Sequence, residues 1–302
     1  MKKTAIYIIG IITCLILADI TIGVLCRNYI KNHRLTGRYQ PLDRLIKEVD
    51  TDIILIGNSA ILNSTNPNIV EDSLGMNCYN GGITGQGIDF FETIIDCILQ
   101  RHTPKLIVIG MRPEEMGEHI GDGIYDVLKP YYGIGYKSID DHFNNTDGPE
   151  RLLMHSNLYR YNTIWVRVLL YMLFDKTVYQ ENGFMPKEVP TPLPKLNKID
   201  KCEEPLKRKL ECMERIIRKC KKRNIKVAVC YPPTLMDFGQ DTIPCVKAIK
   251  DLCDKNDIKC LIYYNDKRFQ GKTELFYDDG HVNKNGADEF SKILSHQLKA
   301  EI

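Results

Sequence analysis

Short, almost wholly apolar segments alternate with amphipathic segments along most of the chain. Five apolar segments have the length and composition of buried parallel strands, namely 52–57, 77–80, 105–110, 225–230 and 258–263. Segments with helical spacing or helix-start signals lie between and after them, at 67–74, 88–100, 203–223, 243–255 and 285–298. This alternation predicts an α/β fold of the flavodoxin-like type, with three α/β/α layers around a five-stranded parallel sheet.

The N-terminal segment departs from this alternation. The 23 residues Thr4–Cys26 carry a single charge, Asp19, and about 20 apolar residues in a helix suffice to cross a bilayer. We therefore predict one uncleaved transmembrane helix, a membrane anchor over residues 1–27. A cleaved signal peptide with Lys2 and Lys3 as its basic start is the alternative, but the apolar segment is long for one and no small-residue cleavage site follows it.

The charges that flank this segment do not settle its orientation. Two lysines precede it and four basic residues follow it between 27 and 38, so charge counting alone places the main domain in the cytoplasm. Many bacterial anchors with a short basic N-terminus nevertheless export a large domain. We expect a single-pass membrane protein whose main domain is extracytoplasmic.

A polar linker (about 27–44) leads into the α/β domain, which we expect to cover 45–302. Within it the alternation stops between the third and fourth strands, which indicates an insertion at about 113–200. The insertion is rich in tyrosine, contains the apolar segment 164–174 and ends in the proline cluster 186–194. The apolar segment is either a helix packed on the core or a lid or membrane-facing helix over an active site.

Composition narrows the class of protein without naming it. The 302 residues include 41 basic and 39 acidic side chains, a net charge of +2, which argues against a nucleic-acid partner. The 11 cysteines are odd in number and form no C-x-x-C pair, which is atypical of a disulfide framework. No Cys or His pair has the spacing of a zinc site, and we expect neither a metal nor a cofactor.

Polar clusters follow two of the strands and precede the last helix. Gly57-Asn58-Ser59 places a serine at a tight turn after the first strand. Near the C-terminus, Asp278 and His281 are three residues apart in a turn, so the carboxylate can orient the imidazole while its other nitrogen accepts a proton. Because serine needs an adjacent base that is itself oriented, we predict a catalytic triad of these three residues: Ser59 as nucleophile, His281 as base and Asp278 as its partner.

Taken together, these motifs resemble those of the SGNH (GDSL-like) hydrolases. Gly57-Asn58-Ser59 matches the first block of the family, Asn80-x-Gly82 the second and Asp278-x-x-His281 the last, and the resemblance covers about 50–300. The anchor, the insertion and the D-x-x-H-x-N ending look like the membrane-attached SGNH proteins of cell-envelope polysaccharide acylation, such as those serving alginate acetylation and teichoic-acid D-alanylation.

The resemblance also implies an oxyanion hole, with one departure. It implies that the backbone N–H groups of Ser59 and Gly82 donate to the oxyanion. The third block of the family supplies an Asn in a G-x-N-D setting, but here the residues are Gly110-Met111-Arg112-Pro113. Arg112 either donates in place of that Asn, binds a negative part of the substrate, or turns away and leaves two donors.

The resemblance therefore implies a membrane-anchored serine esterase or O-acyltransferase that acts on an ester, such as an acetyl ester, of an envelope glycan. The implied partners are an acylated polysaccharide or other ester substrate, the membrane and a membrane-bound acyltransferase. The alternative, which the Arg112 departure motivates, is a non-catalytic SGNH-fold protein that holds glycan for such an acyltransferase.

Overall fold

The computed structural model describes residues 2–35, 37–118, 127–162, 164–174, 182–199, 202–239 and 243–300. The chain forms two compact units, one made of Met1–Asp43 and Tyr125–Val178 and the other of Arg44–Ile124 and Tyr179–Ile302. Parts of the expected insertion, at 119–126, 163, 175–181 and 200, lie outside the described residues.

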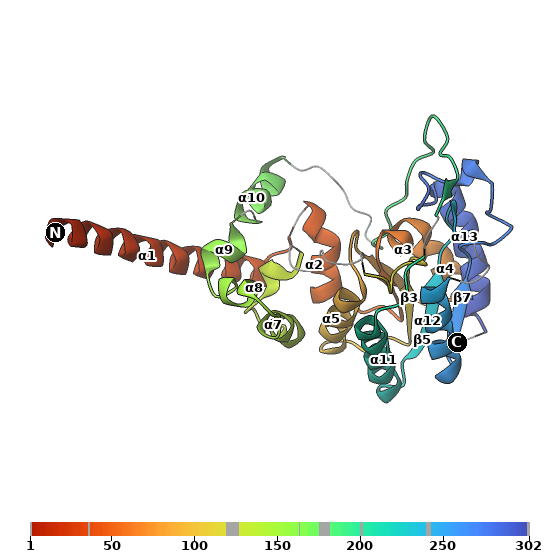
Figure 1. Cartoon of the computed structure of the whole chain (residues 1–302), viewed down its shortest axis with the longest axis horizontal. Coiled ribbons are helices and arrows are strands. Elements are labelled where there is room, and N and C mark those ends of the chain that lie inside the picture. Colours follow the sequence, from red (N-terminus) through yellow and green to blue (C-terminus); the bar gives the residue numbers. More distant parts are fainter. Residues whose placement is uncertain are drawn as a thin grey trace. The chain divides into compact units, whose positions relative to one another are not determined.

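The larger unit is built on a five-stranded sheet, as the apolar pattern predicted (Figure 1). Its strands are β1 (Ile53–Gly57), β2 (Cys78–Gly82), β3 (Leu106–Gly110), β5 (Lys226–Tyr231) and β7 (Lys259–Ile262). They run in the order β2-β1-β3-β5-β7, and all neighbours are parallel. Numbered along the chain, this is the 2-1-3-4-5 order of flavodoxin-like folds, in which ligands bind beyond the carboxyl ends of the strands.

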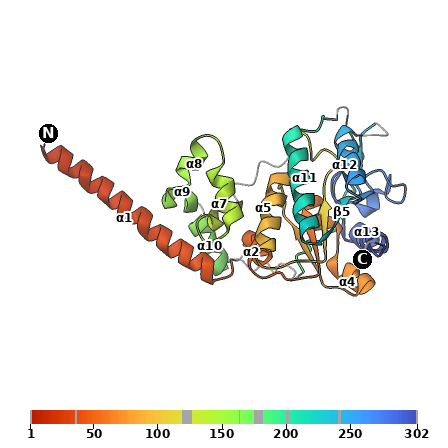
Figure 2. The same cartoon turned by 90° about the horizontal axis from the view of Figure 1, so that it is seen from below.

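Helices cover both faces of this sheet. They are α3 (Ser59–Ser64), α4 (Pro67–Leu74), α5 (Ile88–Leu99), α11 (Lys207–Lys222), α12 (Pro244–Lys255) and α13 (Lys284–Leu298). Helix α5 lies beside α11 and α11 beside α12, whereas α4 lies beside α13 (Figure 2). Because crossovers between parallel strands are right-handed, α5, α11 and α12 lie on one face of the sheet, and α4 and α13 lie on the other.

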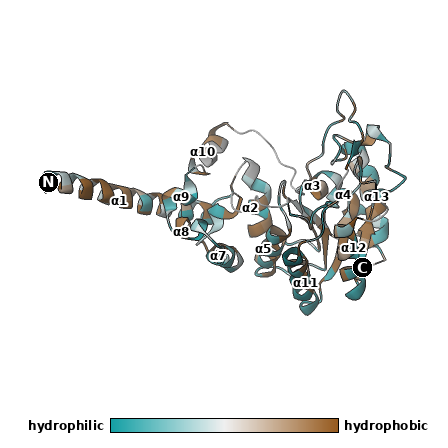
Figure 3. Cartoon of the chain, viewed as in Figure 1, coloured by the Kyte–Doolittle hydropathy of each residue, from teal (hydrophilic) through white to brown (hydrophobic). Residues whose placement is uncertain are grey.

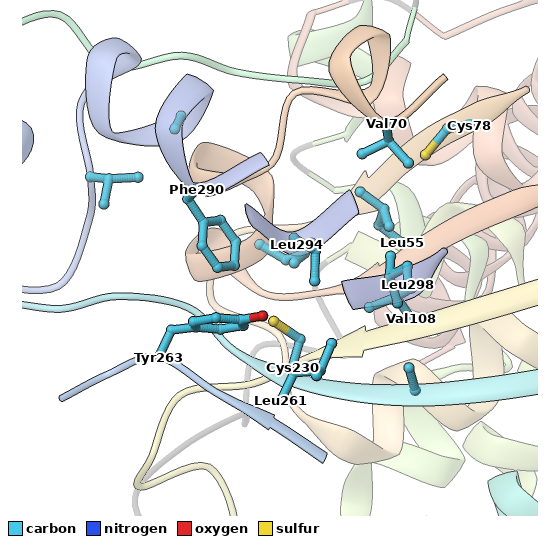
Figure 4. Close-up of a cluster of buried hydrophobic side chains, with 14 of the residues drawn as sticks. Leu55, Val70, Cys78, Val108, Cys230, Leu261, Tyr263, Phe290, Leu294 and Leu298 are labelled. Atoms are coloured by element: carbon cyan, nitrogen blue, oxygen red, sulfur yellow. The ribbon is translucent and has the colours of Figure 1, made fainter. Parts of the chain in front are cut away.

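The core beneath α4 and α13 shows why the strands read as continuous apolar runs. Leu55, Val108 and Cys230 point from neighbouring strands toward Phe290 and Leu294 of α13, and all five are buried (Figure 4). The alternate strand residues, which face the other helices, are buried as well. A parallel sheet with helices on both faces has no solvent-exposed side, so its central strands β1 and β3 carry no polar side chain at any position.

The smaller unit contains the N-terminal helix. Helix α1 (Lys2–Asn32) is long and apolar enough to cross a membrane (Figure 3). Most of its large apolar side chains are exposed. The expected polar linker at 27–44 is wrong in detail, because α1 continues to Asn32 and is followed by η1 (Gly37–Tyr39) and α2 (Gln40–Lys47). The amphipathic pattern of α2 is a single short repeat, which explains why the sequence did not reveal it.

The central part of the expected insertion is also helical. It contains η2 (Lys129–Tyr131), α7 (Lys137–Asn144), α8 (Pro149–Leu153), α9 (Asn157–Tyr161) and α10 (Ile164–Phe174). The apolar segment 164–174 is thus a helix, as both interpretations of it required. The remaining elements belong to the larger unit: η3 (Thr273–Leu275) and a two-stranded parallel sheet of β4 (Asn197–Lys198) and β6 (Met236–Asp237).

Candidate active site

Three neighbouring strands end in glycine at one level of the sheet. Gly57 pairs in register with Gly82 on one side and with Gly110 on the other. A Cβ at any of the three would lie 2.6–2.8 Å from side-chain atoms of Ile61 in α3. The glycines therefore let α3 pass directly over the carboxyl ends of the strands, which places its first residue at the ligand-binding edge of the sheet.

That first residue is Ser59. Asn58 caps the helix, because its Oδ1 accepts from the backbone N–H of Ala60 at 2.9 Å. Ser59 follows the cap directly, and the N–H groups of a first helical turn have no acceptor inside the helix. The Ser59 N–H therefore has no acceptor within α3, and its use as an oxyanion donor stays a prediction.

The structure brings the three predicted triad residues together. His281 Nε2 lies 2.7 Å from Ser59 Oγ, and His281 Nδ1 lies 2.8 and 3.0 Å from the two carboxylate oxygens of Asp278. A carboxylate only accepts hydrogen bonds, so Nδ1 carries the proton and Nε2 is left to accept from the serine hydroxyl. This chain of contacts is the arrangement that activates a serine for attack on a carbonyl carbon.

The turn that carries Asp278 and His281 is held by its own backbone. Phe276 and Val282 form an antiparallel bridge, and the Tyr277 N–H donates to the His281 carbonyl oxygen at 2.8 Å. Asn283 is fully buried, caps α13 and donates through Nδ2 to the Glu274 and Phe276 carbonyl oxygens. The terminal Asn of the D-x-x-H-x-N pattern thus anchors the turn to the last helix.

Charge and exposure in this turn suit a site that meets a substrate. Partial burial acts to raise the pKa of Asp278, but hydrogen bonds from His281 and from the Gly280 N–H outweigh it and hold the pKa below its ordinary value. The side chains of His281 and Asp278 remain 19% and 42% exposed. The carboxylate therefore stays ionised at neutral pH, and the imidazole can be reached from outside.

The second predicted oxyanion donor has a partner inside the protein. The Gly82 N–H donates to Asn80 Oδ1 at 3.0 Å. Asn80 is fully buried, and its Nδ2 donates to the carbonyl oxygens of Ile61 and Thr65 at 2.9 and 2.8 Å, which ties β2 to α3. A substrate oxygen at Gly82 would have to share or replace the Asn80 bond.

Arg112, the third predicted donor, lies beside the turn that carries His281. Its guanidinium Nη2 lies 3.6 Å from Met236 Sδ. The same nitrogen would lie 3.5 Å from a Cβ atom if Gly280 had a side chain. Its Nε pairs with Glu114 Oε1 at 2.8 Å. The guanidinium is thus at the right end of the sheet, but part of its hydrogen-bonding capacity is already used.

Sequence reasoning missed Glu115, whose buried side chain contacts Asn58 in the serine turn. The carboxylate is 1% exposed, Asn58 Nδ2 donates to its Oε2 at 2.6 Å, and its Oε1 has no hydrogen-bond partner among the described residues. Burial raises its pKa to about 8 despite the nearby Lys209 ammonium. Nothing in the run Pro113-Glu114-Glu115 distinguishes this side chain from a surface glutamate, so no sequence signal marks it.

A cavity of about 340 Å³ lies next to the turn that carries Asp278 and His281. Thr234 and Met236 form part of its wall, and the Thr234 hydroxyl donates to the Asp279 carbonyl oxygen at 2.6 Å. The remaining lining mixes four polar side chains with apolar and aromatic ones and two glycines: Asp237, Asn265, Lys267 and Gln270, then Leu196, Phe238 and Tyr264, then Gly239 and Gly271. Over the described ranges, no group of three or more His, Cys, Asp or Glu side chains could hold a metal ion.

The comparisons with known proteins find likenesses only among solved structures. No protein-family model and no curated protein matches the sequence. Among solved structures it is similar to a lipase/acylhydrolase from Enterococcus faecalis (11% identity, TM-score 0.43, covering 82% of this chain and 95% of that one). It is also similar to the psychrotrophic esterase EstA of a Pseudoalteromonas species (12%, 0.42, 83% and 98%). A third is a GDSL-like lipase from Bacteroides thetaiotaomicron VPI-5482 (12%, 0.38, 82% and 87%).

At identities of 11–12% and TM-scores of 0.38–0.43, these likenesses establish neither a class, a substrate nor a set of acting residues for this chain. What the chain can do chemically is therefore inferred from its own side chains.

Proposed function

We propose that the chain is a serine esterase or acyltransferase of the SGNH type, with Ser59, His281 and Asp278 as its catalytic triad. The observation that carries the proposal is the continuous hydrogen-bonded chain from Ser59 Oγ through the imidazole to the Asp278 carboxylate, at 2.7 and 2.8 Å. The two ends of this hydrogen-bonded chain, Ser59 and Asp278, are 219 positions apart in the sequence, and the Ser59–His281 contact spans 222 positions. A chance surface contact rarely satisfies all three partners at once.

The reaction follows from these contacts. Ser59 Oγ attacks the ester carbonyl carbon while His281 Nε2 takes the hydroxyl proton, and the carbonyl oxygen becomes an oxyanion. The tetrahedral intermediate then expels the alcohol, which leaves with the proton from His281, and an acyl ester remains on Ser59. Water or a sugar hydroxyl attacks this ester, gives its proton to His281, and Ser59 Oγ recovers it as the acyl group leaves.

The substrate and location are the finer part of the proposal. The polar cavity beside Asp279 is suited to the non-reacting part of a hydrophilic ester, such as an acetylated glycan. An N-terminal helix that is long and apolar enough to span a membrane would keep the enzyme at the cell envelope, with its main domain extracytoplasmic. A membrane-bound acyltransferase would be a natural partner there.

The test is ester turnover by the full-length, detergent-solubilised protein with p-nitrophenyl acetate as substrate. Ser73 in α4 is exposed and outside the site, so Ser73→Ala is the matched control for Ser59→Ala. We expect Ser73→Ala to keep wild-type turnover and Ser59→Ala to lose it. Full turnover by Ser59→Ala would refute the proposal.

A non-catalytic glycan-binding role is the second candidate. It is favoured by the state of the oxyanion donors, since the Gly82 N–H is bonded to Asn80 and Arg112 is paired with Glu114. Such a protein would show no wild-type turnover and no reaction of Ser59 with a fluorophosphonate, yet it would still bind acetylated glycan. Labelling of wild type but not of Ser59→Ala excludes it.

A further inference from the structure

The single charge in the apolar segment of α1 is held by the segment that follows α8. Asp19 accepts hydrogen bonds from the Ser156 hydroxyl, the Asn157 side-chain amide and the Leu158 backbone N–H, each at 2.8 Å. One turn further along α1, a Cβ on Gly23 would lie 2.2 Å from Asn157 Cγ. The carboxylate and the glycine together form a tight docking surface for α9 on the side of α1.

This docking surface lies within the part of α1 that we expect in the membrane. Asp19 precedes Cys26, the last residue of the apolar segment, by seven positions, or about 10 Å of helix. Polar groups inside a bilayer persist where protein partners satisfy them. The three donors to Asp19 supply those partners, so the residues that carry them accompany α1 into the outer part of the bilayer.

The helices on either side of this contact expose large apolar side chains. In α8, Leu152 is 76% and Leu153 41% exposed, and in α10, Leu173 and Phe174 are 63% and 72% exposed. Trp165, Val166 and Leu170 of α10 are exposed as well. Seven large apolar side chains exposed on two short helices are more than scattered surface residues, and such exposure is typical of an interaction surface.

We infer that Pro149–Phe174, the α8–α10 segment, is a second membrane contact that inserts its exposed apolar side chains among lipid acyl chains beside α1. The inference rests on α1 spanning the membrane. The bilayer is the occupant because α9, which lies between α8 and α10 in the chain and contacts α10, packs on α1 at Asp19 and Gly23, inside the apolar segment. The contact of Arg160 with the Tyr132 carbonyl oxygen and ring ties α9 to the rest of the unit and fixes its docking.

The chain offers a direct probe, because Trp165 is its only tryptophan and is 48% exposed. The full-length protein is reconstituted into phosphatidylcholine vesicles with and without brominated acyl chains, and tryptophan emission is recorded with iodide as the aqueous quencher. Trp165→Phe/Tyr7→Trp, which moves the probe to an exposed site in α1, is the membrane control. Trp165→Phe/Tyr277→Trp, with the probe in the larger unit, is the aqueous control.

We expect Trp165 emission to be blue-shifted, quenched by brominated lipid to an extent comparable with the Tyr7→Trp control, and insensitive to iodide. A second variant, Leu170→Asp/Leu173→Asp, should reduce quenching by brominated lipid at least twofold while the Tyr7→Trp control stays quenched. Quenching of Trp165 by iodide alone would overturn the inference. Blue-shifted emission that neither quencher reaches would also overturn it, because it would mean that protein covers this surface.

The outcome is separable from that of the proposed function. Ester turnover by Ser59 depends on the larger unit, whereas the quenching experiment reports on α10 alone. A quenched Tyr7→Trp control with an unquenched Trp165 would leave the anchor standing and remove only the second contact.

Discussion

The carboxyl ends of β1 and β3 are neighbours in the sheet, yet the polar side chains that follow the two strands have very different hydrogen-bond and ion-pair partners. After β1, the Asn58 side chain caps α3, and the Ser59 hydroxyl is hydrogen-bonded to His281 Nε2. After β3, Arg112 is paired with Glu114, and Glu115 is turned inward beneath the serine. In the proposed mechanism, Ser59 is therefore already paired with its base in the free protein, whereas a substrate oxygen at Gly82 or Arg112 would compete with a partner that is already bound.

The largest effect should come from the β1 side. Ser59→Ala removes the nucleophile, and we expect kcat for p-nitrophenyl acetate to fall by about 10³–10⁶. Circular dichroism should be unchanged, because the Ser59 side chain is half-buried and supports no core contact. A kcat within tenfold of wild type would place the nucleophile elsewhere and end the contrast between the two strand ends.

Asp278→Asn should have the next largest effect. An amide can donate to His281 Nδ1 and so stabilise the tautomer that cannot accept the serine proton, and we expect a loss of about 10²–10⁴ in kcat. Asp279→Asn is the matched control, because the Asp279 carboxylate bonds to Asn197 rather than to the imidazole. Equal losses in the two variants would mean that the turn, and not the imidazole contact, was disturbed.

The β3 side is probed by Arg112→Ala, with a smaller expected loss. One missing oxyanion donor lowers kcat by about 10²–10³ in serine hydrolases, and we expect about 10² here because Arg112 shares its guanidinium with Glu114. Arg112→Lys should recover part of this loss. An unchanged kcat, with KM raised instead, would assign Arg112 to substrate binding and leave an oxyanion hole of two donors.

The smallest effect concerns Glu115 and appears in stability rather than in rate. Its pKa of about 8 in the folded protein exceeds the ordinary value of 4.5, so the folded state holds a proton that the unfolded chain releases between these values. Stability therefore falls as pH rises from about 5 to about 8. Glu115→Gln can keep the Asn58 contact without ionising, and we expect it to gain about 3.5 kcal/mol over wild type at pH 8 relative to pH 5.

Thermal unfolding at the two pH values measures this difference. Glu118→Gln, at an exposed position nearby, should follow wild type. Parallel pH dependence in wild type and Glu115→Gln would show that the buried carboxyl is not the group responsible.

The sheet and the triad were within reach of sequence reasoning for simple physical reasons. A strand covered on both faces is apolar along its length, so a segment such as 53–57 is easily distinguished in the sequence from the amphipathic segments around it. Asp278 and His281 lie three residues apart, and a serine after a strand-ending glycine is a local pattern too. Each of these features depends on neighbours in sequence.

The features that sequence reasoning missed depend on neighbours in space. Helix α3 is six residues long, too short for a periodic pattern, and it exists because Asn58 caps it and Asn80 binds its carbonyl oxygens. Glu115 is buried only because the chain after β3 turns under the serine. The role of Asp19 likewise required residues 137 or more positions away, since its contact with Ser156 spans that distance in sequence.

The central claim is that Ser59 is the nucleophile, and covalent mapping tests it most directly. Full-length wild-type protein is treated with a fluorophosphonate, digested and analysed by tandem mass spectrometry. The account predicts a single phosphonate adduct on Ser59, absent from Ser59→Ala and much slower to form in Asp278→Asn. An adduct on another residue, or no adduct under conditions in which the protein still hydrolyses ester, would contradict it.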